Sequence, residues 1–178
     1  MSMFKTRDGW VKIFEEKDVL AIPPEPECVM EDSLCLDEAC SDLAYLVREA
    51  GLLFDGIDRV VGFGVESLTV ADGLARSIAM EKTSGFCFRS CIKENLAIAG
   101  ETTFLTRPVQ PGEKVLLCVD ILRSPRLKYN SERIMRAVQL ITKAKGIVLP
   151  VVAVLLNCSD LLEIDRRKIV SLVNYSAD

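Results

Sequence analysis

The chain has 178 residues, of which 49% are hydrophobic and 27% charged, and its formal net charge is −4. This length and balance predict one soluble domain with its own core, and the negative charge argues against non-specific nucleic-acid binding. The sequence contains no histidine, which excludes Ser-His-Asp and Cys-His catalysis and every histidine-ligated metal site.

The seven cysteines are an odd number, and residues 1–18 carry charges throughout. No secretory signal is therefore predicted, and free thiols in a reducing, cytoplasmic compartment fit better than a disulfide scaffold. No apolar run reaches the ~18–20 residues needed to span a bilayer. Neither a membrane nor a nucleic acid is expected as a partner.

The predicted elements begin with an N-terminal part, residues 1–57, that forms a small hood and the first helix of a single domain. Within it, residues 10–14 alternate weakly, which indicates a strand, and a proline-rich break follows at 23–26. Residues 36–51 place apolar side chains at i, i+3 and i+4 and end at Gly51, as an amphipathic helix does.

Residues 58–178 form the predicted core of the same domain. It opens with a strand–glycine turn–helix unit: a buried strand at 58–63, a turn at 62–67 and a helix at 67–79. A second strand at 85–89 leads into a two-stranded arm at 90–111, which we expect to turn at Gly100-Glu101.

The remaining elements, in chain order, are a Pro111-Gly112 turn, a buried strand at 114–120, a polar loop at 123–130, a helix capped by Ser131 and running to about Ala144, a strand at 147–156 and an edge strand at 165–175. This order predicts an α/β fold whose mainly parallel sheet is flanked by helices, with a β-hairpin arm and a small N-terminal hood.

Ligands of such sheets bind beyond the carboxyl ends of the strands, and three places qualify: after Phe63, after Arg89 and after Asp120. The first is glycine-rich and leads into a helix N-terminus, so its backbone amides could bind phosphate. As a dinucleotide GxGxxG fingerprint it fails, because Ser67 stands at the third glycine. A purely structural tight turn is the alternative.

Asp120, at the end of a buried strand, suits a ribose hydroxyl or a metal-bound phosphate. Arg123, Arg126 and Lys128 follow it closely. Guanidinium groups match phosphate oxygens, so this segment is either a phosphate clamp or a solvated basic loop.

Six short segments follow one another in an order that is typical of one enzyme family. They are Val60–Ser67, Ala71–Ala75, Phe86–Arg89, Pro111–Asp120, Ala144–Val148 and Arg167–Leu172. From about Asp58 to Tyr175 the chain thereby resembles the type I phosphoribosyltransferases, the group of orotate and adenine phosphoribosyltransferases. The resemblance implies transfer of a phosphoribosyl group from phosphoribosyl diphosphate to a nucleobase-type acceptor. It also implies a homodimer, with Mg²⁺ on the substrate diphosphate and no protein metal site. A non-catalytic regulator or nucleotide-binding module of the same fold is the alternative.

Matched positions carry the family's roles to residues of this chain. Asp120 would hold ribose hydroxyls and Lys93 would meet the diphosphate, both as catalytic residues. The other implied substrate-binding residues are Gly64, Val65, Glu66 and Ser67 at the pyrophosphate turn, Arg89 at the diphosphate, and Arg123, Arg126 and Ser131 at the 5-phosphate.

The donor motif is degenerate. The family has two adjacent acids and then a Thr-Thr-Gly run that cradles the 5-phosphate. Here Ile121 stands in place of the second acid, and the loop at 122–131 lacks that run and reads as longer.

Overall fold

A seven-stranded sheet forms the centre of the computed structural model, which describes residues 7–16, 33–63, 66–83, 87–97, 100–105, 107–123, 127–159 and 161–175. The strands are β1 (Arg59–Phe63), β2 (Phe88–Ala97), β3 (Gly100–Leu105), β4 (Lys114–Arg123), β5 (Ile147–Cys158), β6 (Glu163–Ile164) and β7 (Arg167–Asn174). The helices are α1 (Arg7–Glu16), α3 (Ser33–Glu49), α4 (Glu66–Glu81), α5 (Leu127–Lys143) and the short 3-10 helix η1 (Phe54–Gly56).

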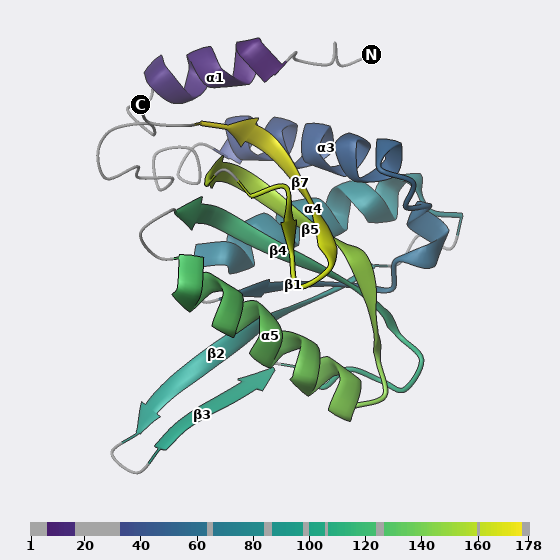
Figure 1. Cartoon of the computed structure of the whole chain (residues 1–178). Coiled ribbons are helices and arrows are strands. Elements are labelled where there is room, and N and C mark those ends of the chain that lie inside the picture. The colour runs from purple at the N-terminus through teal and green to yellow at the C-terminus, as the bar shows by residue number, and fades with distance from the viewer. Residues whose placement is uncertain are drawn as a thin grey trace.

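The sheet is mainly parallel, as predicted. Its order is β3-β2-β1-β4-β5-β7-β6, and β2, β1, β4, β5 and β7 run parallel to their neighbours among these five. The two outer strands, β3 and β6, are antiparallel to theirs. Among the described residues, β2 pairs from Lys93 onward with β3 alone, and the two project from the body as the predicted hairpin arm (Figure 1).

Helices cover both faces of the sheet. Of the described helices, α1, α3 and α4 lie on one face and α5 on the other (Figure 1). Strand alternation divides the core accordingly: Val60 and Leu116 pack with α3 and α4, whereas Val61 and Leu117 pack with α5.

Helices α3 and α5 end in the same way. At the end of α3, Gly51 has φ +97 and its N–H donates to the Arg48 carbonyl at 2.9 Å. At the end of α5, Lys145 takes the left-handed conformation with φ 61, and the Gly146 N–H donates to the Ile141 carbonyl at 2.9 Å. These are Schellman-type ends, so the predicted helix ends at Gly51 and at about Ala144 are confirmed.

Five sequence predictions of local structure are wrong. Residues 10–14 lie in α1, because Trp10 and Phe14, four apart, share the buried face of a helix. The second strand begins at Phe88 and continues to Ala97, where it pairs with Gly100, so Gly100 belongs to β3 and not to the turn. Residues 165–175 are not an edge strand, since β7 lies between β5 and β6. The fifth error is the helix cap at Ser131, which lies inside α5.

No helix among the described residues is long and apolar enough to cross a membrane.

Candidate functional site

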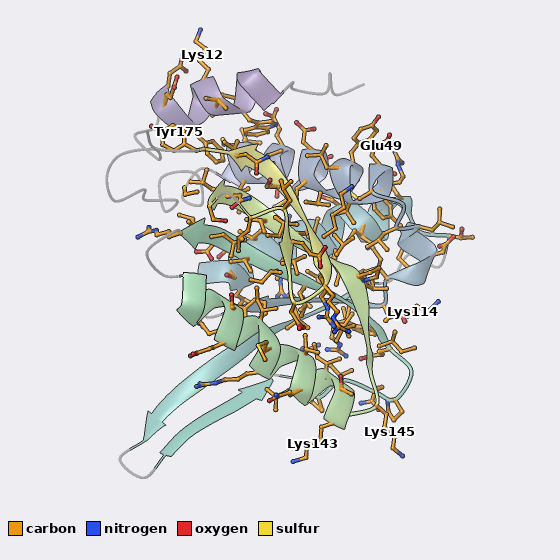
Figure 2. All side chains as sticks on the ribbon, in the orientation of Figure 1. Lys12, Glu49, Lys114, Lys143, Lys145 and Tyr175 are labelled. Carbon is orange, nitrogen blue, oxygen red and sulfur yellow. The ribbon has the colours of Figure 1, made fainter. Side chains whose placement is uncertain are left out.

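At the carboxyl edge of the sheet, β4 extends several residues beyond the end of its neighbour β1, and we call this offset the step. Gly62, next to the end of β1, pairs with Cys118 of β4, but β4 continues to Arg123, supported by pairing with β5 as far as Cys158. Asp120 therefore lies on the part of β4 that passes beyond β1. Figure 2 marks the two edges of the sheet: Tyr175, which follows β7, lies at the carboxyl edge, and Lys114, which begins β4, lies at the amino edge.

The first turn of α4 occupies the step above β1, and there Ser67 meets Asp120. The Ser67 hydroxyl donates to Asp120 Oδ1 at 2.8 Å, and the Asp120 backbone N–H donates to Ser67 Oγ at 3.3 Å. Ser67 has 0% exposure. The carboxylate thus lies beside a helix N-terminus, whose partial positive charge favours an anion.

Glycine is required at position 62 by the close approach of α4 to β1. A Cβ added to Gly62 would lie 2.5 Å from the backbone oxygen of Ser67, which is too short for any carbon–oxygen contact. The same oxygen accepts a 3.9 Å hydrogen bond from the Cys118 thiol. Two neighbouring strands therefore fix the backbone of Ser67, while its side chain reaches Asp120.

The structure brings only part of the predicted site together. Ser67 and Asp120 touch, Glu66 is the first residue of α4 and Arg123 ends β4 at the same edge of the sheet. Lys93 lies on β2, opposite Phe104 of β3. Gly64, Val65 and Arg126 lie outside the described residues.

Arg89 does not lie where its predicted role requires. It is the second residue of β2 and pairs with Val60, near the amino end of the parallel strands, so the premise that it ends its strand is wrong. Its guanidinium forms an ion pair with Asp72 of α4, and Asp72 also pairs with Arg76 at 3.6 Å. Arg89 thus joins a surface charge network at the far end of β2 from the carboxyl edge.

The loop after Asp120 is shorter than the sequence indicated. β4 extends to Arg123 because Ile121 and Leu122 are buried β-formers, 6% and 0% exposed. α5 then begins at Leu127, leaving only residues 124–126 between the two elements. Ser131 is the fifth residue of α5, so the prediction that it caps the helix is wrong, while its contact with a phosphate stays a prediction.

Three of the thiols are not nucleophiles, and the described residues form no metal-binding cluster. Burial raises the pKa of Cys40 to about 12 and that of Cys87 to about 11, and it also raises the pKa of Cys118. These three thiols are protonated at neutral pH and are not activated nucleophiles. Within the ranges that the structure describes, no three Cys, Asp or Glu side chains cluster to hold a metal ion.

A surface cavity of about 260 Å³ lies against α5, lined by Arg136, Gln139, Leu140 and Lys143. It is on the opposite face of the sheet from Ser67, which packs on the α4 side. This cavity is therefore separate from the step at the carboxyl edge.

The sequence singled out Ser67 and Asp120 but not their contact, because the contact depends on how far β4 passes β1. It also missed Gly62 and Cys118 as the residues that seat the turn. The sequence held part of the information needed to find them, because Gly62 and Cys118 lie on strands that were both predicted to be buried and parallel.

Comparison with known proteins identifies the fold but no close relative. No protein-family model matches the chain, and no curated protein matches it in sequence. Among solved structures, orotate phosphoribosyltransferase from Aeropyrum pernix superposes with a TM-score of 0.62 at 14% identity, over 85% of this chain and 77% of that one.

Two adenine phosphoribosyltransferases superpose similarly. The Rhodothermus marinus enzyme gives a TM-score of 0.59 at 15% identity, over 83% of this chain and 84% of that one. The Trypanosoma brucei enzyme, solved with AMP, pyrophosphate and ribose-5-phosphate, gives 0.58 at 16% identity, over 84% and 68%. With its mainly parallel sheet, covered faces and hairpin arm, the chain has the fold of the type I phosphoribosyltransferases.

Proposed function

We propose that the protein binds phosphoribosyl diphosphate at the step between β1 and β4 and transfers its phosphoribosyl group to a nucleobase-type acceptor. One observation carries the proposal. In a phosphoribosyltransferase fold, the carboxylate of Asp120 lies at the carboxyl edge of the sheet, held by Ser67 at the N-terminus of α4. That edge is where open parallel sheets bind their ligands.

The proposed roles follow from charge. Asp120 accepts hydrogen bonds from ribose hydroxyls, and the turn that leads into α4 offers backbone amides to the diphosphate. Lys93 and Arg123 add positive charge near the leaving group and the 5-phosphate. In the reaction a bond forms between the base nitrogen and C1′ of ribose while the C1′–oxygen bond breaks, and pyrophosphate leaves with the electron pair.

Mg²⁺ belongs to this proposal as part of the substrate. The described residues near Asp120 contain no acidic cluster that could cage the ion. Phosphate oxygens and water are its usual ligands when it enters on a diphosphate. The chain's task is then to position the donor and complement its charge, which needs no histidine.

A second candidate is donor or nucleotide binding without turnover, in a regulator or subunit. Ile121 favours it, because that side chain is buried in the core and leaves a single carboxylate at this point of β4. The position of Arg89, far from the carboxyl edge, also removes one cation that the resemblance implied. A homodimer and a cytoplasmic location remain predictions under both candidates.

The proposal is tested by titrating the protein with phosphoribosyl diphosphate and Mg²⁺ while following its melting temperature. A ligand at 100 times its dissociation constant stabilises the fold by about 2.7 kcal/mol. We expect a dose-dependent rise that disappears in Asp120→Ala. The absence of a rise at millimolar ligand would refute donor binding.

Turnover is tested separately by measuring pyrophosphate release with a panel of purine and pyrimidine bases. Release that needs both a base and Asp120 supports transfer. Donor binding without release from any base would replace transfer with the second candidate.

A further inference from the structure

Ser67 was implied to contact the substrate, but its hydroxyl is already engaged within the protein. We propose that Ser67 is a positioning residue. It holds the Asp120 carboxylate in its binding orientation and joins the N-terminus of α4 to β4. This inference rests on the proposed function, since it assigns how Asp120 meets the donor.

The Ser67 hydroxyl makes two hydrogen bonds to Asp120. A serine hydroxyl has one hydrogen to donate and two lone pairs to accept. Here the hydrogen goes to Asp120 Oδ1 at 2.8 Å, and a lone pair accepts the Asp120 backbone N–H at 3.3 Å. Ser67 is 0% exposed, so it cannot meet a ligand without breaking this arrangement, and it acts through Asp120.

The backbone of Ser67 is held independently of its hydroxyl. The Ser67 carbonyl accepts from the Cys118 thiol at 3.9 Å and packs closely on Gly62. Removing only the hydroxyl should therefore leave the first turn of α4 seated between β1 and β4. A Ser67→Ala variant consequently isolates the contact with the carboxylate.

The hydrogen bond from Ser67 restricts how the Asp120 carboxylate can be oriented. A hydrogen bond to an ionised carboxylate is stronger than one between neutral groups, and it restricts the rotation of the Asp120 side chain. Asp120 lies on β4 and Ser67 in the first turn of α4, so the bond fixes this strand and the N-terminus of this helix relative to each other. Without it, the Asp120 carboxylate loses one of the contacts that orient it, and the affinity for the donor falls.

The experiment measures the affinity for phosphoribosyl diphosphate with Mg²⁺ by calorimetry in three variants. We expect Ser67→Ala to weaken binding about 10- to 100-fold, and Ser67→Cys, which keeps a weaker donor of similar size, to lose less. The matched control is Ser77→Ala, the same substitution on the same helix, where the hydroxyl donates to the Gly73 carbonyl at 3.0 Å. It should bind within about threefold of the unsubstituted protein, since the Ser77 hydroxyl donates to the backbone of α4 and not to Asp120.

A second readout needs no ligand. We expect the ¹³C resonance of the Asp120 carboxyl carbon and the amide proton of Asp120 to shift in Ser67→Ala and to stay in place in Ser77→Ala. These two signals report whether the hydrogen bonds between Ser67 and Asp120 exist in solution, and the loss of affinity reports what they do for binding. If Ser67→Ala does not fold, Ser67→Cys carries both measurements.

The outcomes separate this inference from the proposed function. If the unsubstituted protein binds the donor and Ser67→Ala binds equally well, or if Ser77→Ala loses as much, the positioning role is wrong. If the unsubstituted protein does not bind the donor, the proposed function fails. The Asp120 resonances then decide alone: a selective shift supports the role of Ser67 in holding the carboxylate, and unchanged resonances overturn it.

Discussion

The pair of Arg59 and Glu113 at the amino edge of the sheet offers the most direct test of what holds the fold. The guanidinium donates from Nε to one carboxylate oxygen and from Nη2 to the other, each at 2.9 Å. The two side chains are only 5% and 13% exposed. Glu113 also accepts the backbone N–H of Gln110 at 2.9 Å, and the guanidinium lies 5.4 Å from the ring centre of Phe88.

Replacing Glu113 with Ala should strongly destabilise the protein, because the Arg59 charge would stay buried without its carboxylate. Breaking a buried pair in this way costs about 3–5 kcal/mol. For a domain of this length, 1 kcal/mol corresponds to about 2–4 °C, so the melting temperature should fall by about 6–20 °C. Denaturant unfolding followed by circular dichroism gives the free energy, and calorimetry gives the melting temperature.

The control is the double variant Arg59→Leu/Glu113→Leu, which removes both charges and fills the space with apolar side chains. It should recover most of the loss, since replacing a whole buried pair is often close to neutral. A loss below about 1 kcal/mol in Glu113→Ala, the size seen for exposed pairs, would refute the reasoning. So would a double variant that is at least as unstable as the single one.

The same pair predicts a pH dependence. Burial alone would raise the pKa of Glu113, but hydrogen bonds from Arg59 and the Gln110 amide outweigh it, and the pKa lies below its usual value. Because the folded pKa is lowered, the stabilisation is fully present above the unfolded pKa of about 4.3 and is lost as the pH falls through the folded value. The free energy of unfolding relative to the double variant should therefore be constant from pH 7 to about 5 and shrink below that. A difference that does not change down to pH 3 would contradict the assignment.

Three further substitutions test packing and should be measured by denaturant unfolding. Gly73→Ala would place a Cβ 2.6 Å from Cys40 Sγ and should cost about 1–3 kcal/mol. Adding Cys40→Ala should return part of that cost, and no return would argue against the clash. Trp10→Phe removes the 2.7 Å hydrogen bond from the indole to the buried carboxylate of Asp42 and should cost about 1.5–3 kcal/mol. Gly62→Ala forces the first turn of α4 away from β1, so it should both destabilise the fold and abolish the thermal shift with phosphoribosyl diphosphate; a variant that keeps the shift would show that the turn has room to move.

The elements that were predicted well are those whose signal is local. α3, α4 and β5 have long, regular apolar patterns, and each was placed to within a few residues of its bounds. α1 was missed because five residues are too few to separate a period of 2 from one of 3.6. What makes it a helix is tertiary, since Trp10 reaches Asp42 on α3.

The site was predicted less well because its geometry is set by pairing between distant segments. The position of Arg89 depends on its register with Val60, and the reach of β4 beyond β1 depends on β5. Neither register can be read from a single strand. The sequence could therefore name Asp120 and Ser67, but it could not show that one holds the other.

Ile121 stands where the phosphoribosyltransferases that the sequence resembles have a second acid, and this fold gives a physical reason for an apolar side chain there. Its side chain is 6% exposed and packs within the larger core cluster, on a strand paired to Leu156. Burying such a side chain stabilises the fold by about 1.5–3 kcal/mol, whereas a carboxylate in the same surroundings would need a partner to offset its desolvation. The apolar core at this point of β4 and a second acid thus exclude each other. In the proposed function Asp120 is the carboxylate of β4 that would meet the ribose, so losing its hydrogen bond from Ser67 should weaken donor binding.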